Sequence, residues 1–179
     1  ARILLDSLRT EALSFLKVKD NATFAEMKSL YGTSLKSFVD KAVSLELLNP
    51  ELQKMDLDFL GNQIKPERDL LFSYLGLQTL YDRYFIHSNE IRFELPQVFF
   101  MRVAMGLAIA EDNREERAVE FYNLLSSFDY MSSTPTLFNA GTPHSQLSSC
   151  YLTTVPDDLY GIYGALQDNA MLSKWAGGL

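Results

Sequence analysis

Apolar side chains recur at helical spacing through about the first 130 residues, and this pattern ends abruptly at Ser132. A period near 3.6 residues places the apolar side chains of a helix on one face, which then has to pack against other helices. The chain has 179 residues, of which 47% are hydrophobic, enough to build a core of ordinary size. The sequence therefore predicts a mainly α-helical domain over residues 1–133, followed by a segment of different character.

Local signals predict where several of these helices begin and end. Thr23 and Glu26 form a capping-box pattern that opens a short helix, which Gly32 should end. Pro66 should open a longer helix that runs to about Phe85. Further helices are expected over residues 3–16, about 35–48, 96–110 and about 113–128, with a short extended segment over 91–95.

The few cysteine and histidine residues restrict the chemistry that this chain can perform alone. Its single cysteine, Cys150, excludes an internal disulfide framework, and His87 and His144 lack the spacing of metal ligands, so we expect no metal site. The net charge of −7, without a run of five basic residues, argues against a nucleic-acid partner. No apolar run approaches the ~20 residues that span a bilayer, so we expect a cytoplasmic protein without a membrane partner.

The segment after Ser132 differs in composition from the helical region. Residues 132–143 are rich in Ser, Thr and Pro and are expected to be irregular, and residues 148–154 have the composition of a strand. Asp157 or Asp158 is well placed as the N-cap of a helix that runs to about Ser173.

Four motifs stand out in this segment, Ser133–Thr142, Gln146–Cys150, Asp157–Tyr163 and Ser173–Gly178. In their order and spacing they closely resemble the large, catalytic subunit of class I ribonucleotide reductases. Upstream, Tyr74–Tyr81 resembles the helical domain of the same family, and the similarity is weaker before residue 60. Several motifs in one order are far more specific than any single short pattern.

The resemblance implies a fold and a reaction. The chain would comprise a helical N-terminal domain, residues 1–133, and the first strand and helix of a ten-stranded α/β barrel, residues 134–179. The family reduces ribonucleotides to deoxyribonucleotides through a thiyl radical supplied by a metal-containing small subunit. The implied partners are this small subunit, a second copy of the chain, ATP or deoxynucleoside triphosphate (dNTP) effectors, and thioredoxin or glutaredoxin as reductant.

Cys150 is the first candidate for chemistry. A cysteine in a strand is more often a small buried hydrophobe, but the resemblance makes Cys150 one half of the redox-active dithiol that reduces the substrate. Its partner thiol and the radical cysteine are absent from this chain. We therefore expect these 179 residues to be incomplete and inactive alone, with Gly177–Leu179 leading into a missing segment.

Three further residues are implied to bind the substrate together with Cys150. Thr136 and Ser149 would lie at its ribose and phosphate, because small hydroxyl side chains offer both a donor and an acceptor. Gly178 would line the same site, where a side chain would obstruct the ligand. Taken without the resemblance, Thr136 is a turn hydroxyl and Gly178 a glycine that ends a helix.

The resemblance places an allosteric effector at the start of the last expected helix. Asp157 would accept a hydrogen bond from the deoxyribose of the effector, Asp158 and Leu159 would add backbone contacts, and Lys174 would lie near its phosphates. Without the resemblance, the aspartate is a helix N-cap and the lysine a solvated surface residue.

The helix after Asp158 carries an apolar stripe of Ile162, Leu166, Ala170 and Met171. Such a stripe usually faces a core, whereas the resemblance implies that it packs against its copy in a second subunit. Two other interpretations stay open: a non-catalytic helical binding module or regulatory remnant, and one half of a split subunit.

Overall fold

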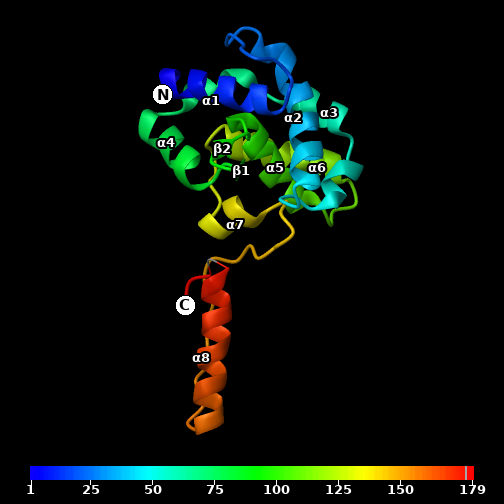
Figure 1. Ribbon diagram of the computed structural model, residues 1–179. Helices are drawn as coiled ribbons and strands as arrows, with labels where there is room; N and C mark the ends of the chain where they lie inside the picture. The colour runs from blue at the N-terminus through cyan, green and yellow to red at the C-terminus, as the bar shows by residue number, and fades with distance from the viewer. Residues whose placement is uncertain (176) are drawn as a thin grey trace.

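The computed structural model describes residues 1–175 and 177–179 (Figure 1). Its elements, in chain order, are α1 (Arg2–Phe15), α2 (Met27–Ser44), η1 (Pro50–Lys54), α3 (Leu57–Gln63), η2 (Pro66–Leu71), α4 (Tyr74–Arg83), β1 (His87–Ser88), β2 (Ile91–Arg92), α5 (Pro96–Ala108), α6 (Arg114–Ser126), α7 (Thr134–Asn139) and α8 (Leu159–Lys174). We call residues 1–143 the body. Residues 149–175 and 177–179 form the arm, which projects away from the body.

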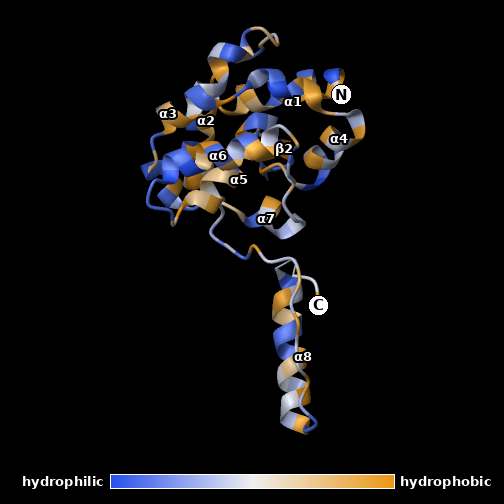
Figure 2. Ribbon diagram, turned by 180° about the vertical axis from the view of Figure 1, so that it is seen from behind, coloured by the Kyte–Doolittle hydropathy of each residue, from blue (hydrophilic) through white to orange (hydrophobic). Residues whose placement is uncertain are grey.

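Helix α5 forms the centre of the body. Eleven of its 13 residues are buried, and it packs against α2, α6 and α7. Figure 2 shows α5 mostly in hydrophobic colours, among helices that carry both hydrophilic and hydrophobic residues. The expected helices over 3–16, 96–110 and 113–128 are confirmed as α1, α5 and α6, to within about two residues at most ends. A helix with so few polar residues is stable in water only when other elements cover it.

The hydrogen bonds of the predicted capping box form, but they precede α2, which begins at Met27 without a side-chain cap, and the prediction that Gly32 ends this helix was wrong. The Thr23 amide donates to Glu26 Oε2 at 2.8 Å, yet α2 continues through Gly32 to Ser44. Gly32 instead lies against Gly61 of α3, where a Cβ on Gly61 would stand 2.8 Å from the Gly32 Cα. The two glycines therefore allow α2 and α3 to approach at backbone distance, a reason for glycine that only the tertiary structure reveals.

The continuous helix expected from Pro66 to Phe85 was also wrong. The chain forms the 3₁₀ helix η2, turns at Phe72, and begins α4 at Tyr74. Ser73 caps α4 by accepting a hydrogen bond from the Gly76 amide at 3.1 Å. Phe72 is buried in an aromatic cluster, with its ring centroid 5.1 Å from that of Phe128. Burial of this ring therefore accompanies the break in the helix.

A hairpin and a short helix complete the body. The extended segment expected over 91–95 contains β2, which pairs antiparallel with β1 through His87 opposite Arg92. The expected irregular stretch instead contains the helix α7. The missed signal was Pro135, which suits the first turn of a helix because its lost N–H needs no partner there.

A buried polar network joins α2, η2, α5 and α6. Tyr31 donates to Asp69 at 2.6 Å, Gln97 donates to the same carboxyl at 2.9 Å, and Tyr122 donates to Gln97. Burial raises the pKa of Asp69 to about 6, although the two hydrogen bonds oppose that shift. Burial likewise raises the pKa of Tyr122 to about 12. The network thus keeps polar groups satisfied inside an otherwise apolar core.

The arm has little internal packing. Residues 148–154, expected as a strand, form only an isolated parallel bridge between Cys150 and Gly178. A strand needs a neighbour to form its ladder, and the described residues offer none. Helix α8 begins as expected with Asp158 as its N-cap, and Ala165 is its one buried residue among those described. The stripe is therefore not part of a core here, since Ile162, Leu166 and Met171 are all exposed.

None of the described helices combines the length and the apolar character that crossing a membrane requires.

Candidate functional site

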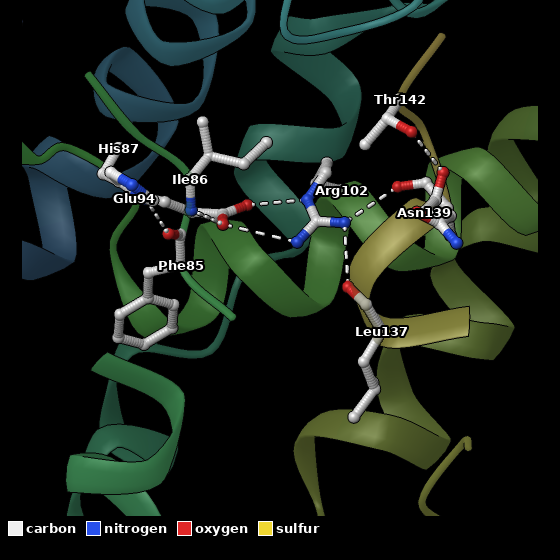
Figure 3. A network of polar contacts seen from close by, with 9 residues as sticks. Phe85, Ile86, His87, Glu94, Arg102, Leu137, Asn139 and Thr142 are labelled. Carbon is white, nitrogen blue, oxygen red and sulfur yellow. Dashed lines mark hydrogen bonds and ion pairs between the residues drawn. The ribbon is translucent and has the colours of Figure 1, made fainter. Parts of the chain in front are cut away.

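The position of α7 is set by a fully buried ion pair, which we call the clamp and define as Arg102 and Glu94 (Figure 3). Arg102 Nε donates to Glu94 Oε1 at 2.8 Å, and Arg102 Nη1 donates to the carbonyls of Leu137 at 3.1 Å and Ala140 at 2.8 Å. Glu94 Oε2 also accepts from the Ile86 amide at 2.8 Å. The clamp therefore joins the hairpin, α5 and the C-terminal end of α7.

A close backbone contact reinforces this arrangement. A Cβ on Gly106 of α5 would stand 2.1 Å from the Gly141 amide nitrogen, so a side chain here would displace the loop after α7. Gly141 itself has a φ of +79°, a conformation that favours glycine. The Asn49 amide donates to the Gly141 carbonyl at 2.9 Å. The loop is thus held from two sides of the body.

Thr136 lies on α7 and is largely buried. Its Oγ1 donates to the Leu147 carbonyl at 3.0 Å, and Asn139 Nδ2 donates to the Gln146 carbonyl at 2.7 Å. Thr136 is therefore not the loop hydroxyl bonded to nearby backbone that the sequence suggested without the resemblance, because it lies on a helix and its partner is 11 residues away. These two bonds also fix the chain just before Ser148, so α7 determines where the following Ser149 and Cys150 begin.

Ser149, Cys150 and Gly178 lie together, as the resemblance implied. The Gly178 amide donates to the Ser149 carbonyl at 2.6 Å, and the Tyr151 amide donates to the Gly178 carbonyl at 2.9 Å. A Cβ on Gly178 would stand 2.8 Å from the Ser149 carbonyl oxygen and 3.7 Å from Cys150 Sγ. Cys150 is a free, exposed thiol with Ser149 Oγ 3.5 Å away. Among the described contacts, Thr136 does not touch these three residues.

Two contacts that sequence reasoning missed join the arm, which carries this cluster, to residues 144–146, the segment that follows the body. The rings of His144 and Trp175 lie with their centroids 3.6 Å apart. Gln146 Nε2 donates to the hydroxyl of Tyr151 at 2.7 Å. The sequence left His144 unassigned, because a lone histidine carries no signal for an aromatic partner 31 positions away.

The four effector candidates occupy opposite ends of α8. Asp158 caps the helix by accepting from the Gly161 amide at 2.9 Å, while Asp157 and Leu159 are exposed beside it. Lys174 is the last residue of the helix, 16 positions after Asp158. At ~1.5 Å per residue this separation is about 24 Å. The expectation that Lys174 lies near the same effector as Asp157 therefore does not hold within one chain.

The part of the chain described here contains no group of three or more His, Cys, Asp or Glu side chains arranged to hold a metal ion. The chemistry available at the cluster is that of one thiol, one hydroxyl and backbone amides.

Comparison with known proteins identifies the same family over most of the chain. The family described as "Ribonucleotide reductase, all-alpha domain" matches residues 70–145. The chain is 51% identical over 180 aligned positions to the ribonucleoside-diphosphate reductase subunit alpha of Chlamydia muridarum (strain MoPn / Nigg), covering 100% of the chain and 17% of that relative. It is 51% identical over 128 residues to the subunit alpha of Helicobacter pylori (strain ATCC 700392 / 26695), covering 71% of the chain and 16% of that relative.

A less similar relative belongs to the same family. The ribonucleoside-diphosphate reductase large chain 2 of Saccharomyces cerevisiae (strain ATCC 204508 / S288c) is 40% identical over 138 residues, or 76% of the chain and 15% of that protein. The chain thus spans about one sixth of the length of each of these relatives.

Proposed function

This chain belongs to the family of ribonucleoside-diphosphate reductase large subunits, and we propose that it forms the beginning of the catalytic part of such an enzyme, which reduces ribonucleotides to deoxyribonucleotides. The observation that supports this most is the contact of Ser149 and Cys150 with Gly178. An exposed thiol, a hydroxyl and a glycine without a side chain leave room for a ligand to reach the sulfur.

In this proposal Cys150 supplies half of the reducing equivalents. A radical formed elsewhere in the enzyme removes the 3′ hydrogen of the ribose, the 2′ hydroxyl leaves as water, and the same hydrogen returns to the 3′ carbon at the end, which regenerates the radical. Cys150 and a second cysteine outside this chain give up two electrons and two protons and become a disulfide. Thioredoxin or glutaredoxin then reduces that disulfide by thiol–disulfide exchange. The radical comes from a separate, metal-containing small subunit, and the reaction takes place in the cytoplasm.

The remaining substrate contacts follow from the same arrangement. Ser149 Oγ, beside the sulfur, offers a donor and an acceptor to the ribose or phosphate of the substrate. Thr136 would join them once the barrel that we expect after residue 134 brings α7 and the cluster around one nucleotide. Its hydroxyl has accepting capacity left, since the bond to Leu147 uses only its proton.

The effector site takes a different form from the one expected, because α8 separates Lys174 from Asp157. We assign Asp157, Asp158 and Leu159 to the nucleoside of a dNTP effector and the partner subunit's Lys174 to its phosphates. A two-fold axis across α8 would make two copies run antiparallel and bring these opposite ends together. The exposed stripe of Ile162, Leu166 and Met171 is the apolar surface that such packing would cover.

The test is Cys150→Ser in the complete large subunit, assayed with its small subunit and a dithiol reductant. Multiple turnover should be abolished, because serine cannot form the disulfide. Ser145→Ala, an exposed residue of the same segment, is the matched control and should leave turnover unchanged. Unchanged turnover in Cys150→Ser would refute the redox role of Cys150, whereas a complete subunit that never reduces ribonucleotides would favour the alternative of a non-catalytic helical module.

A further inference from the structure

Helix α7 cannot hold its own position. It has six residues, and isolated helices shorter than ~12 residues are marginal in water. Its N-terminal end is joined to α4 by a bond between the hydroxyls of Thr134 and Tyr84 at 3.0 Å, and these groups are exposed. Its C-terminal end is held by the clamp, where both side chains have 0% exposure. The clamp is therefore the buried polar anchor of this helix, beside the packing of Leu137 in the core and of the Phe138 ring on Tyr84.

The main effect of the clamp is to orient α7, and its contribution to the free energy of folding is secondary. Replacing a buried ion pair by apolar side chains of similar volume is often neutral or stabilising, so the pair by itself is weak evidence for a stabilising role. Arg102, however, presents donors in a fixed plane: two groups face the carboxylate of Glu94 and a third faces the carbonyls of Leu137 and Ala140. Apolar packing could cover α7, but it would not fix the direction in which these carbonyls point.

The position of α7 determines where the segment that carries the Cys150 thiol lies, through hydrogen bonds. Thr136 holds the Leu147 carbonyl and Asn139 holds the Gln146 carbonyl, both from α7. Gln146 in turn donates to the Tyr151 hydroxyl. These contacts lie on both sides of Cys150. A shift of α7 would therefore move Thr136 directly and would release the segment that carries Ser149 and Cys150.

We propose that Arg102 and Glu94 are positioning residues for substrate binding: they orient α7 so that Thr136, Ser149 and Cys150 meet the same ribonucleotide. The inference rests on the proposed function. It is specific, because the effector candidates Asp157–Leu159 lie on the arm and share no described contact with the clamp. Loss of the clamp should weaken substrate binding without changing effector binding.

The experiment uses the complete large subunit carrying Arg102→Lys or Glu94→Gln, assayed with its small subunit. Lysine keeps the charge but loses the planar fork of donors. We expect KM for the ribonucleoside diphosphate to rise about tenfold, the factor that corresponds to one net hydrogen bond. We expect kcat at saturating substrate to stay within about twofold, since the thiol chemistry is untouched. The Kd for dATP, as the effector probe, should be unchanged.

Arg68→Lys is the matched control. Arg68 likewise joins two elements, through Asn123 at 3.0 Å and Ser126, but it is only partly buried and has no described contact with α7. It should change the thermal midpoint without changing KM. If Arg102→Lys and Glu94→Gln fold normally and leave KM unchanged, the positioning role is refuted. If KM and the Kd for dATP rise together, the clamp is a general structural element and the proposal also fails.

Hydrogen exchange separates this proposal from the proposed function. Amides of residues 137–147 should exchange faster in Arg102→Lys and Glu94→Gln, and those of α8 should not. This measurement needs no enzymatic activity. Faster exchange in an enzyme that never reduces nucleotides would reject the proposed function and retain the clamp as the anchor of α7, whereas unchanged exchange would refute the clamp itself. A variant that fails to fold is replaced by the other one, because each removes a different half of the clamp.

Discussion

The body and the arm use apolar residues in opposite ways. Leu35 on α2 has 0% exposure and lies in the core of the body, whereas Leu166 on α8 is 61% exposed. Both are leucines on amphipathic helices, and their local sequences predict burial equally well. The body provides partners for its helices from within the chain, and the arm does not. An amphipathic helix therefore indicates that a partner exists, not that the partner belongs to the same segment.

The largest expected effect tests this comparison directly. Leu35→Ala should lower the free energy of unfolding by about 2–5 kcal/mol, because it leaves a cavity in a packed core. Leu166→Ala should change it by less than about 0.5 kcal/mol, as is usual for surface substitutions. Urea denaturation of the 179-residue chain measures both. A large loss for Leu166→Ala would mean that the arm packs against something within this chain after all.

The second prediction concerns the pH dependence of stability, which should come from the body because the buried carboxyl of Asp69 lies there. The pKa of Asp69 is raised from 3.8 to about 6, so between these values the folded state binds its proton more tightly than the unfolded state does. Stability contributed by this group is present below about pH 4 and is lost as the pH rises through about 6, by roughly 3 kcal/mol in total.

Asp69→Asn should remove this decline, which urea midpoints measured between pH 4 and pH 7 would show as a flatter profile. Asp58→Asn is the control, because the Asp58 carboxylate is largely exposed and faces Lys36 at 3.3 Å. A profile for Asp69→Asn with the same slope as the unaltered chain would contradict the assigned pKa.

The third prediction concerns the arm, and its expected effect is smaller than the losses expected in the body. Asp158→Ala removes the N-cap bond to the Gly161 amide and should destabilise α8 by about 1 kcal/mol. Because α8 has almost no contact with the body, hydrogen exchange at the start of α8 should accelerate while the unfolding midpoint of the body stays constant. A matching shift of that midpoint would show that body and arm unfold as one unit.

Much of the helical architecture could be predicted from local patterns. Helices α1, α5 and α6 follow from apolar periodicity, and Asp158 was one of two residues predicted to cap α8. The helix α7 was missed although Pro135 is a local signal for it, but the errors at Gly32 and Phe72 share another cause: the structure at each depends on the residue that lies opposite. Gly32 faces Gly61, and Phe72 enters an aromatic cluster. Neither partner is adjacent in sequence.

At the candidate site, too, the sequence predicted some features, and others depend on contacts between distant segments. The resemblance to a known family was enough to name Ser149, Cys150 and Gly178, and the structure brings them into contact. It did not reveal the clamp, because Arg102 and Glu94 resemble ordinary surface charges in the sequence. It also placed Lys174 with Asp157, where the length of α8 keeps them apart.

The sequence alone determined the family, the helical class and the identity of the exposed thiol, because these depend on residue types, their order and their local period. Only the tertiary structure decided that the charged pair Arg102 and Glu94 is buried and directs α7, and that the apolar stripe of α8 is left uncovered. Burial is a property of what surrounds a side chain, and segments far apart in the sequence supply those surroundings.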